Sequence, residues 1–108
     1  MPRFVIYAKY TPAALTEVRK AGYASREAQM RALPESLGGK LEAAYFMPST
    51  QWDFMAIMEL PSSAAAFAMA SLGNASGSFE RADYAELFSA DEADAAIAAS
   101  TTWSPPGR

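Results

Sequence analysis

The order of strand-type and helix-type segments constrains this chain more than any other feature of its 108 residues. Four segments are rich in β-branched and aromatic side chains, and we expect each to form a strand. They are residues 3–10, 40–47, 53–60 and 79–87. Only a short turn of Pro, Ser, Thr and Gln separates the second segment from the third, so these two should form a hairpin.

A helix-type segment fills each of the two longer gaps. The first covers residues 13–37, where apolar residues recur at intervals of three or four. Thr11 and Pro12 suit its start, and Gly22 interrupts it. Pro34 should kink or end this helix, because proline has no backbone N–H to donate.

The second helix should begin at a cap on Ser62 or Ser63 and run to about Leu72, where Gly73 and Asn74 stop it. After the fourth strand, Ser89 precedes an acidic first turn, which favours a short third helix ending near Ser100. The tail, residues 101–108, is expected to be loose. Residues 1–100 then form a single domain.

The resulting βαββαβ order predicts an α+β fold of the ferredoxin-like type, in which a four-stranded antiparallel sheet carries two helices on one face. Alternation along the first strand supports this arrangement. Phe4, Ile6 and Ala8 would lie on an apolar face under the helices, whereas Val5 and Tyr7 would lie on a mixed face. The mixed face is too apolar to stay wet, so we expect a second copy to cover it, giving a homodimer through the sheet face.

The composition excludes several kinds of chemistry, because the chain has no Cys and no His. Disulfides, thiolate nucleophiles, Ser-His-Asp triads and zinc sites with nitrogen and sulfur ligands are therefore ruled out. We expect no metal site and no cofactor. Nine Lys and Arg against twelve Asp and Glu give a net charge of −3, which argues against nucleic acid as a partner.

The sequence also bears on location. Its first residues lack the basic start and apolar run of a signal peptide. It contains no run of about 18 apolar residues that would span a bilayer. A cytoplasmic protein with no membrane partner is the expectation.

Four pieces of the chain, taken together, resemble the GYD family of small bacterial proteins. They are the opening Met1-Pro2 with RFVIYAKYT, the helix-to-strand junction 35–41, the hairpin Gln51-Trp52-Asp53 with FMAIMEL and Pro61, and the helix end 71–74. The resemblance extends from residue 1 to about residue 98. It implies a dimeric α/β-barrel of the ferredoxin-like type and no known reaction, since the family is largely uncharacterised.

The hairpin departs from the family's Gly-Tyr-Asp at two positions. Gln51 stands where the family has Gly, Trp52 stands where it has Tyr, and only Asp53 matches. If the family glycine adopts a positive φ, Gln51 can do so only at a cost. A ligand contact made by the family's Tyr hydroxyl would also change, because Trp offers only an N–H.

Four residues are candidates for binding a ligand, and no catalytic residue is assigned. The candidates are Tyr7, Tyr10, Trp52 and Asp53. Asp53 follows a turn, where its carboxylate either accepts hydrogen bonds from loop N–H groups or faces a ligand at the barrel rim as an acid or base. Trp52 either packs over the hairpin end or the dimer seam, or forms one wall of a pocket for a flat ligand.

Strand parity separates the two tyrosines. Tyr7 would lie on the mixed face, whereas Tyr10 would point into a space between the sheet and the helices; most tyrosines in such positions are packing residues. Charged residues on the strands are expected to form ion pairs at the rim of a dimer. A buried Lys9 paired with a carboxylate would instead mark a site.

Two functions from different classes fit these features. The first is a homodimeric module that binds a small apolar or aromatic ligand without catalysis. The alternative, by analogy of fold, is a cofactor-independent enzyme of the dimeric α/β-barrel superfamily, a small monooxygenase or isomerase acting on an aromatic or lactone-like substrate. Its pocket would be lined by Phe4, Phe46, Phe54, Met58 and Phe67. An enzyme should bring Asp53 or Tyr10 to that pocket with a perturbed ionisation state.

Overall fold

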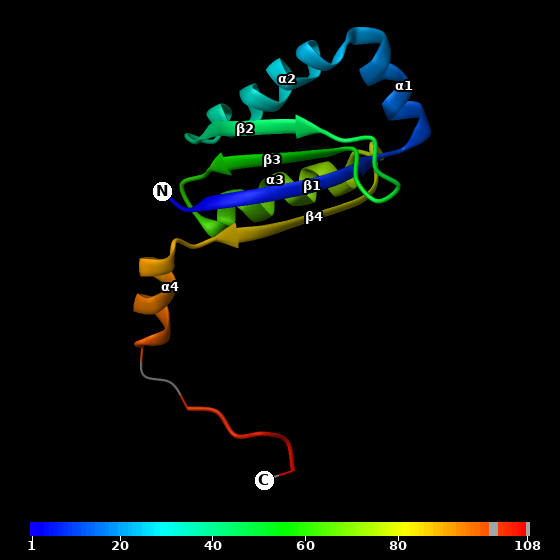
Figure 1. Ribbon diagram of the computed structural model, residues 1–108. Coiled ribbons are helices and arrows are strands. Elements are labelled where there is room, and N and C mark those ends of the chain that lie inside the picture. The colour runs from blue at the N-terminus through cyan, green and yellow to red at the C-terminus, as the bar shows by residue number, and fades with distance from the viewer. Residues whose placement is uncertain (100–101, 108) are drawn as a thin grey trace.

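The computed structural model describes residues 1–99 and 102–107, and these form one sheet with helices attached to it (Figure 1). In chain order the elements are β1 (Arg3–Tyr10), α1 (Pro12–Ala21), α2 (Tyr23–Ser36), β2 (Lys40–Phe46), β3 (Phe54–Glu59), α3 (Ser63–Ala75), β4 (Phe79–Leu87) and α4 (Ala90–Ile97).

The four strands form an antiparallel sheet in the order β2-β3-β1-β4. All four expected strands are present, and β2 and β3 form the expected hairpin, joined by residues 47–53. Helices α2 and α3 cover one face of the sheet and leave the other open (Figure 1). The predicted α+β ferredoxin-like arrangement is therefore confirmed.

The first helical segment is divided into two helices. Thr11 caps α1 by accepting a hydrogen bond from the backbone N–H of Ala14, and Gly22 ends this helix with a φ of 98°. Only glycine adopts such a φ without strain. Pro34 lies inside α2 rather than at its end, but the helix stops soon afterwards, at Ser36. Pro34 cannot donate to the carbonyl of Met30, and only two helical residues follow it.

Helix α3 is longer than the sequence indicates. Ser62 caps it as expected, but the helix continues through Gly73 and Asn74 to Ala75, so the predicted end near Leu72 is wrong. The chain turns away only around Gly77, which has a φ of 75°. Packing of an alanine-rich helix against β4 outweighs the weak helix propensity of these two residues.

Helix α4 leaves the body of the molecule (Figure 1), and none of its residues is buried. It begins with a reciprocal capping box: Glu92 N–H donates to Ser89, and Ser89 N–H donates to the Glu92 carboxylate. The hydrogen bond from the Ser89 N–H lowers the pKa of the Glu92 carboxyl group. The helix ends at Ile97, slightly before the predicted end near Ser100. Ser100 itself, and Thr101 and Arg108 of the tail, lie outside the described residues.

The hydrophobic core lies between the sheet and the helices. Even-numbered residues of the two central strands form its floor, with Phe4, Ala8, Phe54, Ala56 and Met58 all nearly inaccessible to solvent. Val5 is also buried, but it lies on the opposite face and does not belong to this cluster. The predicted alternation is thus observed. In the described ranges, no helix is both long enough and apolar enough to cross a bilayer.

Gly39 provides a test of how closely the helix-to-strand junction packs on β3. A Cβ at Gly39 would lie 2.0 Å from the carbonyl oxygen of Glu59. Gly39→Ala should therefore lower the free energy of unfolding by about 1–3 kcal/mol in chemical denaturation, because backbone must move to admit the methyl group. Gly73→Ala is the matched control. Its Cβ meets the Phe79 ring at an ordinary 3.4 Å, and it should stabilise helix α3 by up to about 1 kcal/mol. Equal effects of the two substitutions would contradict this description of the junction.

Candidate functional site

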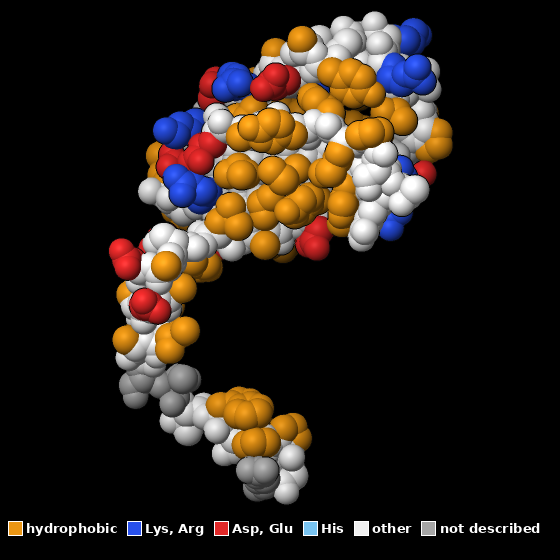
Figure 2. Space-filling view, viewed as in Figure 1, with side chains coloured by type: hydrophobic (Ala, Val, Ile, Leu, Met, Phe, Trp, Pro, Cys, Tyr) orange, Lys and Arg blue, Asp and Glu red, His pale blue; other side chains and the backbone are white. Residues whose placement is uncertain are grey.

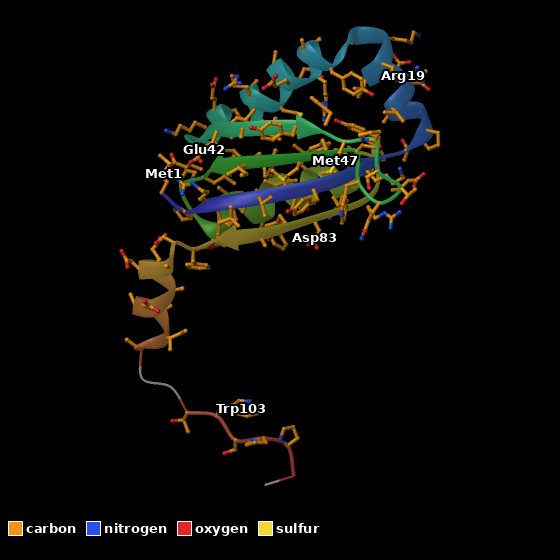
Figure 3. The ribbon with its side chains drawn as sticks, in the orientation of Figure 1. Met1, Arg19, Glu42, Met47, Asp83 and Trp103 are labelled. Carbon is orange, nitrogen blue, oxygen red and sulfur yellow. The ribbon has the colours of Figure 1, made fainter. Side chains whose placement is uncertain are left out.

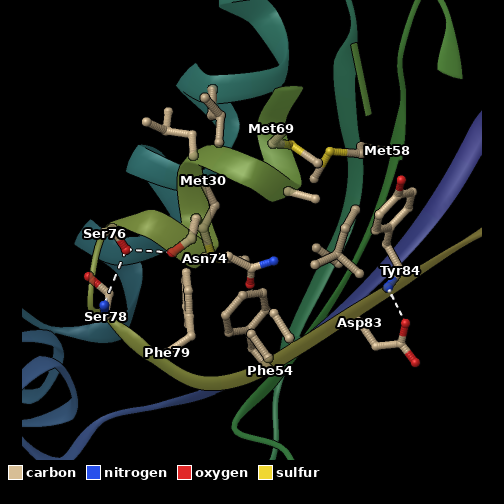
Figure 4. Close-up of a pocket in the computed structure, with 18 of the residues that line it drawn as sticks. Met30, Phe54, Met58, Met69, Asn74, Ser76, Ser78, Phe79, Asp83 and Tyr84 are labelled. Carbon is tan, nitrogen blue, oxygen red and sulfur yellow. Dashed lines mark hydrogen bonds between the residues drawn. The ribbon is translucent and has the colours of Figure 1, made fainter. Parts of the chain in front are cut away.

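A cavity of about 400 Å³ opens between helices α2 and α3, over the helix-covered face of the sheet (Figure 4). It exists because the two helices are anchored on different strands. Helix α2 packs on β2 and helix α3 packs on β4, and these are the two edge strands of the sheet. The surface of the central strands between the helices is left incompletely covered.

The cavity is mainly apolar. Its floor comes from β1 and β3, its walls from the two helices, and one end from β4. Among the residues that surround it in Figure 4 are Phe54, Phe79, Met30, Met58 and Met69. Methionine side chains are flexible and polarisable, and together with two aromatic rings they can adapt to flat or branched apolar ligands.

Tyr10 is buried at one end of this region, on the helix side that strand parity predicts. Its ring stacks on Phe79 with centroids 5.5 Å apart and lies 5.4 Å from the ring of Phe54. Both partners line the cavity, whereas Tyr10 itself lies behind them. Its hydroxyl accepts a hydrogen bond of 2.9 Å from Nε of Arg26. Burial raises the pKa of Tyr10, although the hydrogen bond from Arg26 opposes this effect, so the phenol stays neutral at physiological pH.

Tyr7 and Trp52 lie on the open face of the sheet, away from the cavity. Their ring centroids are 5.6 Å apart, and the guanidinium of Arg81 lies 5.9 Å from the centroid of Trp52. Tyr7 pairs with Met55 of β3 and Asp83 of β4 across the sheet. This cluster is a cation–π and aromatic contact at one end of the open face.

Asp53 connects the hairpin to the end of the first strand. Its Oδ2 accepts a hydrogen bond of 2.8 Å from the backbone N–H of Tyr10, at the point where the register of β1 with β4 shifts. Strand β3 begins only at Phe54, so no β3 backbone carbonyl is paired with that N–H. The carboxylate satisfies it instead. The hydrogen bonds that the turn position suggested come from β1 rather than from the hairpin loop, where Ser49 Oγ accepts from Gln51 and Trp52.

The second oxygen of Asp53 pairs with Lys9. Lys9 Nζ lies 3.7 Å from Asp53 Oδ1, and the two side chains are only 23% and 14% exposed. A largely buried ion pair between Lys9 and a carboxylate is the feature expected from the sequence to mark a functional site. However, each oxygen of Asp53 already has a partner within the chain, the Tyr10 N–H for Oδ2 and the Lys9 ammonium for Oδ1.

The four candidate residues therefore do not form one site. Tyr7, Trp52 and Asp53 gather at one end of the open face, and Tyr10 lies on the other side of the sheet. Of the five residues expected to line an apolar pocket, Phe54 and Met58 do so. Phe67 does not line the main cavity: it lies on the outer side of α3 and is 68% exposed. Helical periodicity does not by itself indicate which side of an alanine-rich helix is buried.

Sequence reasoning missed Arg26, which lines the cavity from α2. A signal was present, because Arg26 lies one helical turn before Met30 and so shares the core-facing side of the helix. Asn74, which the sequence suggested as a helix stop, also lines the cavity (Figure 4). Over the described part of the chain, no three Asp or Glu side chains come together in a way that could hold a metal ion.

The role of Asp53 can be tested by removing its carboxylate. Asp53→Ala leaves the Tyr10 N–H and the Lys9 ammonium without their acceptor, and should lower the free energy of unfolding by about 1–3 kcal/mol in urea. Asp94→Ala, at an exposed position on α4, is the control and should change it by less than about 0.5 kcal/mol. If the urea midpoint of unfolding is the same for both variants and the wild type, the contacts of Asp53 with Tyr10 and Lys9 do not stabilise the fold.

The sequence was compared with curated proteins and with models of protein families. No curated protein matches the sequence. The family model of the GYD domain matches residues 4–97. In the described residues only glycines adopt a positive φ, so Gln51 does not have the strained conformation considered for it from the sequence. The match spans every element of the sheet and all of its helices, and the chain belongs to the GYD domain family.

Proposed function

We propose that this protein is a homodimeric module that binds a small apolar or aromatic ligand in the cavity between α2, α3 and the sheet. The observation that carries the proposal is the cavity itself. Its volume of about 400 Å³ lies within the range of roughly 300–1,000 Å³ that small-molecule sites occupy. Its apolar lining with a few polar residues at one end is also the usual character of such sites.

Binding without catalysis fits the geometry better than the enzymatic alternative. A cofactor-independent monooxygenase or isomerase would need a proton donor or acceptor directed at the ligand. Asp53 is engaged with Tyr10 and Lys9, and the Tyr10 hydroxyl is engaged with Arg26 behind the cavity wall. The groups that the enzymatic hypothesis requires are therefore committed to holding the fold.

The open face of the sheet supports the dimer. Figure 2 shows hydrophobic side chains gathered over the sheet, with charged side chains at the margin. The apolar residues of this face include Val5, Tyr7, Tyr45, Met55 and Ile57. Tyr45, on the edge strand β2, is 63% exposed and adds a large aromatic ring to this uncovered apolar surface.

At one end of this face, around Glu42 (Figure 3), the charges already have partners within the chain. Arg3 contacts Glu42 at 2.9 Å and Glu59 at 3.8 Å, and Lys40 contacts Glu59 at 3.6 Å. A second copy related by a two-fold axis would cover this end without burying an uncompensated charge, whereas Arg81 and Asp83 of β4, which form no ion pair in the described residues, would have to stay at the rim of the interface. Such an arrangement matches the contrast between a dry centre and a polar rim in protein interfaces.

Ligand binding can be tested by filling the cavity. Ala70 lines it from α3, and Ala70→Phe should place a phenyl ring in it and narrow the space left for a ligand. Native mass spectrometry of the purified wild type should show an added small-molecule mass, or uptake of an apolar aromatic probe, that the variant loses. Ala68→Phe, at an exposed position on the same helix that does not line the cavity, should bind as the wild type does. Equal binding by both variants would place the ligand elsewhere.

The dimer can be tested with a charge introduced on the open face. Tyr45→Glu should convert a dimer into a monomer in sedimentation equilibrium at micromolar concentration, because a carboxylate would be buried without a partner. Phe67→Glu makes the same change at a residue of similar exposure on the outer side of α3, and should leave the dimer intact. A wild-type protein that is monomeric at these concentrations would defeat the proposal of a sheet-face dimer.

A further inference from the structure

Arg26 lies at the edge of an apolar cavity and forms no ion pair with any residue that the structure describes. It is half-buried, and it lines the cavity from α2. Ion pairs elsewhere in the described residues join other partners; Glu27, its sequence neighbour, pairs with Arg31. A partly desolvated guanidinium without a carboxylate is costly, and structures generally provide it with an anion.

Contacts with neutral groups hold the guanidinium in place. Nε donates to the hydroxyl of Tyr10 at 2.9 Å, and Nη1 donates to Oε1 of Gln29 at 3.3 Å. The guanidinium carbon lies 5.5 Å from the centroid of the Tyr10 ring. Because Tyr10 is itself packed against Phe54 and Phe79, the position of Arg26 is fixed relative to the cavity wall. Two of the five N–H groups of the guanidinium are used in this way, and the others remain to bind an acceptor.

We propose that Arg26 receives the carboxylate of the ligand, so that the cavity takes aromatic or other apolar carboxylic acids rather than neutral hydrocarbons or amines. The proposal rests on the proposed function, because it assigns the ligand class of the same cavity. A guanidinium binds a carboxylate through two parallel hydrogen bonds, which fixes the orientation of the ligand as well as its charge.

The charge distribution around the cavity favours a monoanion. Among the described residues that line the cavity, Arg26 is the only Lys or Arg. A phosphate dianion bound there would therefore keep one negative charge without a cationic partner in apolar surroundings. The acidic residue among the lining residues is Asp83, on β4. Helix α2 packs on β2, at the opposite edge of the sheet, so the carboxylate would bind at the Arg26 end and the apolar body would extend toward β4.

The test compares three probes with one apolar body and different head groups: 2-naphthoate, 2-naphthalenemethanol and 2-naphthylmethylamine. Isothermal titration calorimetry with the wild-type protein should show 2-naphthoate binding at least about tenfold more tightly than the alcohol, and the amine binding most weakly. Arg26→Met should remove the advantage of the acid, because it should weaken binding of the acid far more than binding of the alcohol. Arg31→Met, on the same helix but paired with Glu27, is the matched control and should retain the advantage.

The outcomes separate this inference from the proposal on which it rests. If acid and alcohol bind equally, and Ala70→Phe abolishes both, the cavity binds ligands but Arg26 does not select a carboxylate, and this inference is wrong. If none of the probes binds and the protein also purifies without a small molecule, the binding function and this inference both fail. Tighter binding of the acid that survives in Arg26→Met would also overturn the assignment.

A direct observation keeps the test valid if Arg26→Met does not fold. The Nε–H of Arg26, held by the Tyr10 hydroxyl, should give a resolved side-chain NMR signal in the wild-type protein. This signal should move on addition of 2-naphthoate and stay in place on addition of the alcohol at equal occupancy. An unmoved signal in the presence of bound naphthoate would contradict contact with the guanidinium. Arg26→Lys, which keeps the charge but lacks the planar fork, should retain only part of the preference for the acid.

Discussion

The antiparallel pairing of β1 with β3 at the centre of the sheet is the constraint on which the other features depend. Phe4 pairs with Met58 and Ala8 with Phe54, so the apolar residues of both strands fall on the same side and form the floor of the core. The residues between them, Val5 opposite Ile57 for example, must then face the other way. One register therefore creates both the covered face that holds the cavity and the open apolar face proposed to dimerise.

The cavity remains open because of where the helices are attached. An alanine-rich helix can approach a sheet closely, and such an approach would have filled this space. However, α3 is packed on β4 and α2 on β2, so the small side chains of α3 bring it near one edge only. The long side chains of Met30 and Met69 line the cavity between the two helices. Because methionine side chains are flexible, they can move to admit a ligand.

Individual residues show how far the sequence could predict the candidate site. Tyr10 was placed on the correct face, because alternation along a strand is a local property. For Trp52 the sequence leaves open whether the ring packs over the hairpin end or the dimer seam or forms the wall of a pocket, and its partners Tyr7 and Arg81 come from two other strands. Arg26 shares the core-facing side of its helix with Met30, but a charged residue on a helix is usually solvated, and only the contacts with Tyr10 and Gln29 show that its guanidinium is held.

The sequence by itself determined the order of the elements, the two faces of each central strand and the absence of His and Cys chemistry, because alternation, capping and composition are properties of neighbouring residues. Tertiary structure alone decided that α3 continues past Gly73, that Asp53 binds the end of β1 rather than its own loop, and that an arginine lies beside an apolar cavity. Each of these depends on contacts between segments far apart in the chain. Such contacts are fixed by the packing of the whole domain, which outweighs local preference.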